Sequence, residues 1–363
     1  MKAKEAELVE REGLIYTEEV LRKFPKVELH RHLEGTFPAE KLYELSIKNN
    51  LDSPRDFERF KESVQFPKDS KPDFLTFLDK FKNDWYRSYE DVYWITYHSV
   101  KNFINDGLFY IELRFSPEHF ALKNDFDREE VTRLIVKAGN KAAKETNIKI
   151  KYLLTFNRGK QTEKEMIPLY NKLKKLNIPE IVGIDLAGDE TNYPPESFKK
   201  YFALIKNDGI YKSTIHAGEV SPSSQIWASI KELHADRIGH GISAVHDPAL
   251  QDYLKEKKVC LEQCITSNYQ TGSWVDERHH PLGELYRKGV PVTINSDDPA
   301  IQGVDLTGDY YKAMSYLGLT IDDLVSLNLM AIKYSFNNEE VKTKLNTDYL
   351  KRVRAFKKRY EIK

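Results

Sequence analysis

The hydrophobic positions of this chain fall into eight short runs, separated by longer stretches of mixed polarity. Most runs are nearly continuous in apolar residues, which is typical of strands buried on both faces of a parallel sheet. The expected strands are Val27–Leu33, Tyr110–Phe115, Ile148–Phe156, Ile181–Leu186, Tyr211–His216, Arg237–Gly241, Val259–Thr266 and Val290–Asn295. Amphipathic segments lie between them: Arg128–Thr146, Pro195–Asn207, Ser223–His234 and Pro281–Lys288. Strand and helix alternating in this way predict one α/β domain over residues 1–363 with the (β/α)8 TIM-barrel fold.

One stretch departs from the alternation, because residues 34–106 separate the first two expected strands. It holds several helical patterns and many aromatic residues. A long ordered insertion at the catalytic end of a barrel commonly forms part of the pocket roof. The alternative is a set of outer helices without ligand contact. We predict a helical lid after the first strand, and C-terminal helices over residues 320–363.

The composition narrows the classes of function. The 56 basic and 56 acidic residues cancel, which argues against an extended electrostatic grip on nucleic acid or on a membrane surface. Only Cys260 and Cys264 occur, too few for a disulfide framework and without a CxxC pair for zinc. The N-terminal segment lacks the apolar stretch of a signal peptide, and no run is long enough for a membrane span. We therefore expect a cytoplasmic protein, and a monomer.

Histidines and acids gather where the expected strands end. The residues concerned are His30, His32, His216, His240, Asp297 and Asp298. The C-terminal ends of barrel strands converge on the site that carries the chemistry. Three imidazoles and one carboxylate there suit a divalent ion, zinc first, with iron, manganese and cobalt as alternatives. Such an ion activates a water molecule as hydroxide near neutral pH. The other histidines, among them His119 and His280, are expected to have structural roles.

Seven short motifs follow one another along the chain. They are PKVELHRHLEG (25–35), ELRFSP (112–117), GIDLAGDE (183–190), HAGE (216–219), RIGHG (237–241), TSNYQTGS (266–273) and NSDDP (295–299). Together they closely resemble the adenosine deaminase family, within the metal-dependent amidohydrolases. The likeness runs from about Phe24 to Asn338, nearly the whole chain. The His-x-His pair alone would be a weak signal, whereas the ordered set is highly specific.

The resemblance implies a ligand set and two catalytic residues. The implied ligands of one zinc ion are His30, His32, His216 and Asp297. Glu219 would sit protonated against purine N1 and act as a general acid. His240 would orient the metal-bound water and help to deprotonate it. The fourth strand ends in IDLAGDE, with no lysine before Lys199 that could bridge two metals, so we expect a single ion.

The resemblance also implies how the substrate is held. Asp298 would accept or share a proton at N7, the backbone N–H of Gly188 would face N3, and Glu34 would reach toward the ribose. Within the insertion, the apolar wall of the family's lid would comprise Phe74, Leu75 and Leu78.

The implied activity is hydrolytic deamination of a small purine nucleoside, adenosine or 2′-deoxyadenosine, with water as co-substrate and ammonia as product, in purine salvage. The family often has HLDG where this chain has Glu34, and a glutamate there also occurs in relatives that deaminate adenine or 6-aminodeoxyfutalosine. These substrates remain alternatives. A non-catalytic binding protein on the same barrel would show loss of a ligand or of the proton donor, and none is lost. A nucleic-acid substrate would need a basic track, which the balanced charge does not offer.

Overall fold

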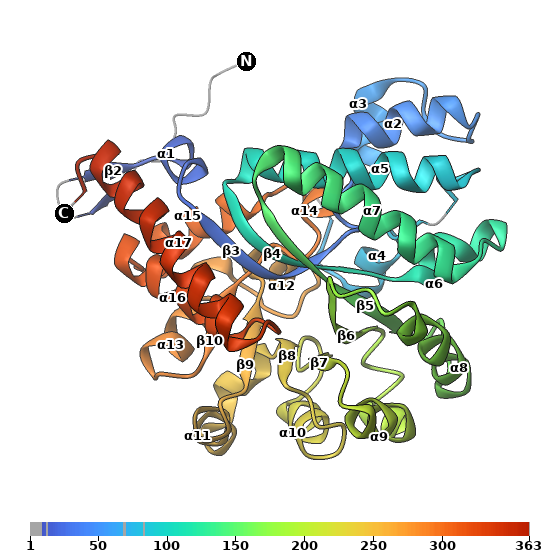
Figure 1. The fold of residues 1–363 in the computed structure, drawn as a ribbon. Helices are drawn as coiled ribbons and strands as arrows, with labels where there is room; N and C mark the ends of the chain where they lie inside the picture. Colours follow the sequence, from blue (N-terminus) through green and yellow to red (C-terminus); the bar gives the residue numbers. More distant parts are fainter. Residues whose placement is uncertain (1–8, 12–13, 68–69, 83, 363) are drawn as a thin grey trace.

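The main body of the protein is a closed parallel barrel. The computed structural model describes residues 9–11, 14–67, 70–82 and 84–362, and in these ranges eight parallel strands form one sheet (Figure 1). Its strands, from one edge of the order to the other, are β3 (Lys26–His32), β4 (Leu108–Phe115), β5 (Lys149–Arg158), β6 (Ile181–Gly188), β7 (Lys212–Ala217), β8 (Arg237–His240), β9 (Cys260–Gln263) and β10 (Val292–Ile294). The ends meet where His32 N–H donates to the Asp297 carbonyl at 3.0 Å and Asp297 N–H donates to the His30 carbonyl at 3.1 Å. The (β/α)8 barrel predicted from the sequence is thereby confirmed.

Each of the expected strands is present, and all but one of their boundaries agree with the structure to within two residues. The run Val259–Thr266 was expected to be extended throughout, but β9 ends at Gln263 and Ile265–Gln270 forms helix α12. Cys264 and Ile265 are fully buried, so the apolar run continues across the junction. Hydrophobic periodicity cannot separate a buried strand from a buried helical turn over so few residues.

Alternation along the strands sorts apolar from polar side chains. In β3 and β4 every residue is buried. Val27, Leu29 and Phe109 pack outward against Ile332 and Tyr349 of the C-terminal helices. The intervening residues of β3, which include both histidines of the His-x-His pair, therefore point to the barrel interior, because side chains of a strand alternate between faces.

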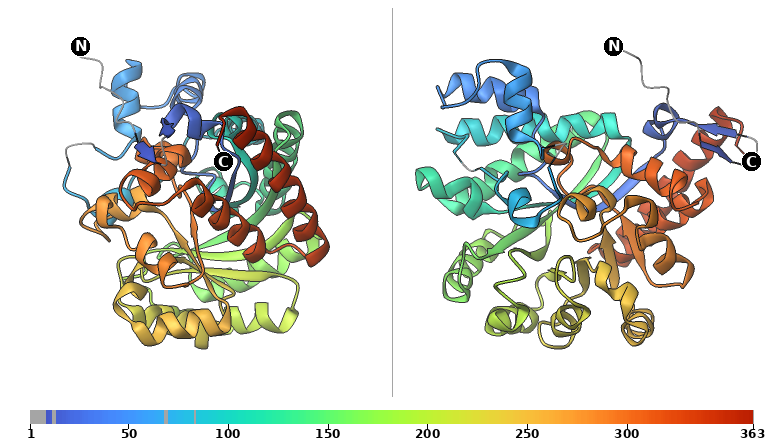
Figure 2. Two further views of the ribbon diagram at one scale, coloured as in Figure 1. Left: turned by 90° about the vertical axis from the view of Figure 1, so that its left-hand side faces the viewer. Right: turned by 180° about the vertical axis from the view of Figure 1, so that it is seen from behind.

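The helices of the described residues lie mostly around the outside of the barrel (Figure 2), whereas α4 lines a cavity at the strand ends. They are α1 (Glu18–Arg22), α2 (Ala39–Lys48), α3 (Phe57–Val64), α4 (Phe74–Leu78), α5 (Tyr89–Asn102), α6 (Pro117–Ala121), α7 (Arg128–Thr146), α8 (Glu163–Leu173), α9 (Lys199–Asp208), α10 (Ser223–Lys231), α11 (Pro248–Lys257), α12 (Ile265–Gln270), α13 (Leu282–Arg287), α14 (Pro299–Gln302), α15 (Leu306–Ser315), α16 (Ile321–Tyr334) and α17 (Glu339–Arg359). Helix α7 has the bounds expected from its amphipathic pattern. Asp127 caps its first turn by accepting from Glu130 N–H at 2.8 Å, and Asn147 ends it in the left-handed region.

The insertion and the C-terminal segment lie on different sides of the barrel. Helices α2, α3 and α5 of the insertion gather at one side, and α16 and α17 lie along the outside of β3 and β4 (Figure 1). A small antiparallel pair, β1 (Val9–Arg11) with β2 (Leu14–Tyr16), precedes the barrel. Within the described ranges, no helix combines the length and the apolar character needed to cross a membrane.

Candidate metal centre and active site

Four potential metal ligands converge at the C-terminal ends of the strands. They are His30 and His32 from β3, His216 from β7, and Asp297 from the loop after β10. Oδ1 of Asp297 lies 3.1 Å from Nε2 of His30 and 3.4 Å from Nε2 of His32. Nε2 of His32 lies 3.2 Å from Nε2 of His216. All four side chains are buried, and their ligand atoms lie within 4.8 Å of one another.

This arrangement fits a divalent cation. In a tetrahedral zinc site with bonds of about 2.0–2.1 Å, ligand atoms lie about 3.3 Å apart, and the three distances above bracket that value. Nε2 of His30 and Oδ1 of Asp297 have no hydrogen-bond partner among the described residues, although both atoms are buried. Buried polar atoms are costly without a partner, and a cation would satisfy them together. Ser267 Oγ donates to Oδ2 of Asp297 at 2.7 Å, which leaves Oδ1 for the cluster.

Two buried carboxylates orient the ligand imidazoles through their other ring nitrogens. Nδ1 of His216 lies 3.0 Å from Oδ1 of Asp185 on β6, and Nδ1 of His30 lies 2.8 Å from Oε2 of Glu262 on β9. Such contacts place the proton on Nδ1 and leave Nε2 free for a metal. Burial opposes ionisation of Asp185, but Arg114 and His216 outweigh it and hold the pKa of this carboxyl below its usual value.

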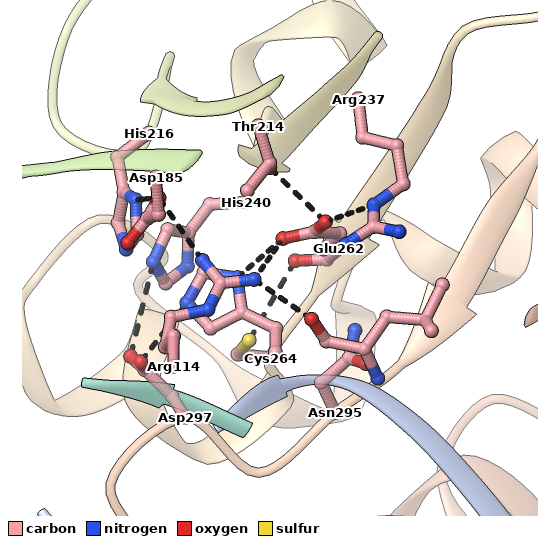
Figure 3. A network of polar contacts seen from close by, with 12 residues as sticks. Arg114, Asp185, Thr214, His216, Arg237, His240, Glu262, Cys264, Asn295 and Asp297 are labelled. Atoms are coloured by element: carbon pink, nitrogen blue, oxygen red, sulfur yellow. Dashed lines mark hydrogen bonds and ion pairs between the residues drawn. The ribbon is translucent and has the colours of Figure 1, made fainter. Parts of the chain in front are cut away.

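A chain of alternating charges supports these carboxylates inside the barrel (Figure 3). Arg114 lies 2.7 Å from Glu262 and 3.3 Å from Asp185. Arg237 lies 2.6 Å from Glu262 and 2.7 Å from Glu112. All five side chains are almost completely buried. Buried charges persist only when they are paired and hydrogen-bonded, so the network fixes the supports of both histidines in one arrangement.

Local backbone geometry aims the side chains that follow the strands. His240 (φ 58°) and Asp297 (φ 61°) both lie in the left-handed region, which costs a non-glycine residue roughly 1–3 kcal/mol. Such strain is found at functional sites, where the surrounding structure holds it. Gly239 precedes His240, and a Cβ atom there would lie 3.1 Å from both His216 Nδ1 and His30 Cε1. Glycine thus lets β8 pass close to the clustered imidazoles.

The cluster opens into a cavity of about 280 Å³. This volume is near the lower end of the range for small-molecule sites. Six residues lie at the cavity floor: His32, His216, His240, Glu219, Asp297 and Asp298. The insertion contributes Phe74, Phe77, Leu78 and Phe81. The remaining wall consists of Glu34, Ser116, His119, Thr155, Asn157, Arg158, Gly159, Lys160, Ala187, Gly188, Asp189 and Tyr193.

Two carboxyl groups at the cavity floor favour their protonated forms. Burial, with the nearby charge of Asp297, raises the pKa of Glu219 well above its usual value. The same two causes raise the pKa of Asp298. Oε2 of Glu219 lies 3.5 Å from Nε2 of His240. The cavity floor therefore pairs a cluster that could bind a metal with a carboxylic acid able to release a proton.

Of the remaining residues expected to contact substrate, all but Leu75 line the cavity. Glu34 lines the cavity, its Oε1 accepts from Ser116 N–H at 2.6 Å, and burial raises its pKa to about 7. Gly188 lines the cavity at φ 95°, and a Cβ there would lie 2.6 Å from the Arg158 carbonyl. Phe74 and Leu78 line it too. Leu75 does not: its side chain is 58% exposed.

Some cavity residues were not anticipated from the sequence. His119 was assigned a structural role, yet it lines the cavity, and burial lowers its pKa to about 3, so the ring is neutral. Phe77, within the same helix α4 as the expected lid residues, and Phe81, shortly after that helix, also line the cavity. The supports Asp185 and Glu262 were also missed, although a charged residue inside an apolar strand run was a visible signal for them.

A parallel barrel with four potential metal ligands at its strand ends, beside a buried carboxyl group, has the residues of a metal-dependent hydrolytic site. The sequence profile described as adenosine deaminase matches residues 25–352. The chain therefore belongs to the adenosine deaminase family, and it is a deaminase.

Individual relatives agree with this assignment. The chain is 34% identical over 329 residues to the adenosine deaminase of Yersinia pseudotuberculosis serotype IB (strain PB1/+), covering 89% of this chain and 96% of that one. It is similar to the crystal structure of an adenine deaminase from Arthrobacter aurescens, with a TM-score of 0.83 and 25% identity, covering 91% of this chain and 99% of that one. An amidohydrolase from Burkholderia ambifaria with bound zinc shares the fold, with a TM-score of 0.86 and 21% identity over 97% of this chain and 98% of that one.

Proposed function

We propose that this chain is a zinc-dependent adenosine deaminase that converts adenosine or 2′-deoxyadenosine, with water, to inosine or 2′-deoxyinosine and ammonia. The observation that carries the proposal is the shared cavity floor, where three of the four clustered ligands (His32, His216 and Asp297) face the same space as Glu219 and His240. Relatives named adenosine deaminase over nearly the whole chain support the same activity.

One zinc ion per chain would be held by His30, His32, His216 and Asp297. When bound, it supplies a hydroxide nucleophile near neutral pH by lowering the pKa of a coordinated water. A second grouping of potential ligands, His240 and Cys264 with Asp297, shares its carboxylate with the first. Burial raises the pKa of the Cys264 thiol well above its usual value, and a protonated thiol is a poor metal ligand. The donor chemistry thus supports a single ion.

Glu219 is the general acid in this proposal. C6 of an aromatic purine is a weak electrophile, and a proton on N1 makes it a better one. Burial and the nearby charge of Asp297 raise the pKa of Glu219 well above its usual value, which favours the protonated form. Glu219 would deliver that proton to N1 as the oxygen of the attacking water bonds to C6. The C6–N6 bond would then break, and the amine would leave as ammonia with the proton of the C6 hydroxyl group, while the proton on N1 stays in the product. The other proton of the attacking water would restore Glu219. General acid–base help of this kind is worth roughly 100- to 10,000-fold.

Other residues position the purine. Asp298, whose pKa is raised by burial and by the charge of Asp297, would share a proton with N7. The backbone N–H of Gly188 would face N3, where the absence of a side chain lets the backbone approach the ring. Phe74, Phe77 and Leu78 would cover the base and exclude water from the reacting carbon.

Polar groups farther along the wall favour a nucleoside over a bare base. Glu34 has a carboxylate oxygen without a hydrogen-bond partner in the described part of the chain. Asn157 and Lys160 line the same cavity. Ribose hydroxyls would pair with these groups, whereas adenine has nothing to offer them. The likeness to an adenine deaminase structure keeps adenine as the second candidate substrate, and 6-aminodeoxyfutalosine would use the same sugar contacts.

A rate panel tests the proposal. Zinc-loaded protein is given adenosine, 2′-deoxyadenosine, adenine, 5′-methylthioadenosine and 6-aminodeoxyfutalosine, and ammonia release is measured for each. We expect the largest kcat/KM for adenosine or 2′-deoxyadenosine. A larger value for adenine, with no turnover of adenosine, would overturn the substrate and leave the deaminase chemistry standing.

A further inference from the structure

A line of hydrogen bonds runs from the cavity into the outer part of the barrel, starting at His240. Nδ1 of His240 lies 3.1 Å from Nδ2 of Asn268 in α12. Oδ1 of Asn268 lies 3.0 Å from Nε2 of His280. Nδ1 of His280 in turn accepts from the backbone N–H of Leu282 at 3.2 Å. His240, Asn268, His280 and Leu282 are all buried, so water does not compete for these bonds.

The backbone N–H of Leu282 gives this line a fixed direction. A backbone amide nitrogen can only donate, so Nδ1 of His280 must be the acceptor and its proton must sit on Nε2. Burial lowers the pKa of His280 to about 3, and the ring is therefore neutral with a single proton. That proton is donated to Oδ1 of Asn268. The amide of Asn268 is thereby oriented with its NH2 group toward His240.

The reverse direction is not available to the same residues. A proton on Nδ1 of His240 would require the Asn268 amide to turn over and present its oxygen to His240. The NH2 group of Asn268 would then face Nε2 of His280. To accept from it, His280 would have to carry its proton on Nδ1 instead of Nε2. The Nδ1–H of His280 would then point at the backbone N–H of Leu282, and neither buried donor would have an acceptor. Buried unsatisfied donors are strongly disfavoured.

We propose that Asn268 and His280 are positioning residues that hold neutral His240 in the tautomer with its proton on Nε2, the ring nitrogen that faces the cavity. This nitrogen lies 3.5 Å from Oε2 of Glu219 and 3.8 Å from Oδ2 of Asp297. The Asn268 bond occupies Nδ1, so the N–H of Nε2 is the only group that His240 presents to a substrate. The significance of this tautomer for catalysis rests on the proposed function.

This tautomer changes the role of His240. The family resemblance implies that the residue helps to deprotonate the attacking water, but a neutral ring with its proton on Nε2 has no free acceptor in the cavity. It donates a hydrogen bond instead. A fixed N–H donor beside the attacking oxygen would hold that oxygen in one orientation toward C6 as it adds. No proton needs to leave His240 for this effect.

Nitrogen NMR of the zinc-loaded, substrate-free protein tests the proposal directly. Protein labelled with ¹⁵N-histidine gives separate shifts for protonated and unprotonated ring nitrogens, and the His240→Gln variant assigns the His240 signals. We expect a protonated Nε2 and an unprotonated Nδ1. A proton on Nδ1 in the unmodified protein, with or without one on Nε2, would overturn the proposal. Because no substrate is present, the result stands even if adenosine proves to be a poor substrate.

Variants of the two positioning residues supply the second readout. Asn268→Asp replaces the NH2 donor with an acceptor, and we expect it to bring a proton onto Nδ1 of His240. Asn268→Leu and His280→Met remove the line of bonds, and we expect kcat to fall about 10- to 100-fold with little change in KM or zinc content. His280→Gln keeps an N–H donor at the Nε2 position and should restore most of the lost rate and the original spectrum.

A structural control separates orientation from simple destabilisation. Leu285→Ala removes a fully buried side chain from α13, the helix that carries Leu282, and should lower stability without changing the His240 spectrum. If Leu285→Ala changed the His240 tautomer as much as His280→Met, the positioning role would be refuted. The same holds if Asn268→Leu left kcat unchanged.

Discussion

Oε2 of Glu262 lies 2.8 Å from Nδ1 of His30 and 2.7 Å from Nη2 of Arg114, so one buried carboxylate supports both a proposed metal ligand and a buried guanidinium. Its other oxygen accepts from Thr214 Oγ1 and from Arg237 Nε. Each carboxylate oxygen of Glu262 thus has two polar partners. The carboxylate links the stability of the barrel to the affinity of the metal centre.

Glu262→Gln is therefore expected to weaken both properties. The amide cannot balance two buried guanidinium groups, and breaking a buried ion pair costs about 3–5 kcal/mol. Loss of the charge behind His30 should lower zinc affinity about 10- to 100-fold. Denaturant unfolding and competition with a metal indicator measure the two effects. Glu165→Gln on the outer helix α8 is the matched control, and equal behaviour of the two variants would contradict the prediction.

Removing the metal should abolish turnover and reduce stability. A ligand that binds only the folded state at a free concentration 100 times its Kd adds about 2.7 kcal/mol to the free energy of unfolding. We expect chelated protein to be inactive, to unfold at a lower temperature, and to recover both properties when zinc is returned. Undiminished deamination by protein shown to contain no metal would refute the assigned centre.

Glu219→Gln should remove the proton donor while leaving the metal ligands in place. The amide is close in size to the carboxylic acid but cannot deliver an acidic proton to N1. We expect kcat to fall by roughly 100- to 10,000-fold, with zinc content still near one ion per chain. Metal analysis and steady-state kinetics on the same preparation make the measurement. Normal turnover would move the general acid to another residue.

Glu34→Asp tests the sugar end of the cavity. The shorter side chain should lose the contact between Oε1 and Ser116 N–H and should withdraw the other oxygen from the ribose. Loss of one charged hydrogen bond corresponds to about 1.5–3 kcal/mol, so we expect KM for adenosine to rise about tenfold or more. The value of kcat should change much less. A similar KM in the variant and the unmodified protein would exclude Glu34 from sugar binding.

Asp309 should make stability depend on pH. Burial raises its pKa in the folded protein from 3.8 to about 7, so between these values the folded state binds a proton that the unfolded state has released. Its contribution to stability is thus present at low pH and is lost as pH rises toward 7, by about 1.4 kcal/mol for each pH unit at most.

The Asp309→Asn variant should remove this slope, because an amide does not titrate. Urea unfolding at pH values from 4 to 8 measures the difference between variant and unmodified protein. Asp252→Asn, on the exposed face of α11, is the control. A difference curve for Asp309→Asn that is flat across this range would contradict the raised pKa.

The sequence predicted those parts of the site that follow from the spacing of residues close together in the chain. The spacing of His30 and His32 placed both on one face of a strand, and the structure directs both into the barrel. His216, His240 and Asp297 lie at or just after the ends of apolar runs, which predicted that all three lie at the C-terminal end of the barrel. The resemblance to the adenosine deaminase family added catalytic roles for Glu219 and His240, which spacing alone could not assign.

Other features were hidden because they depend on contacts across the closed barrel. The apolar pattern of the run that contains β9 fits either a strand or a helix. In the structure the strand ends at Gln263, and Ile265 begins α12 while buried in the core. His119 looked like an ordinary core histidine, yet the fold turns it toward the cavity. Leu75 and Leu78 share one short helix, and the rotation of that helix exposes Leu75 and turns the partly buried Leu78 toward the cavity wall.

The sequence by itself determined the order of the elements and the residue types at each strand end, because these follow from local periodicity and from side chains only a few positions apart. Tertiary structure alone decided which atoms meet. His30 reaches Glu262 across 232 positions of chain, and His240 finds Asn268 and His280 only after the loops beyond β8 and β9 have folded over the barrel. A hydrogen bond forms only when donor and acceptor atoms lie about 3 Å apart. No pattern of residue types along the chain fixes interatomic distances on that scale.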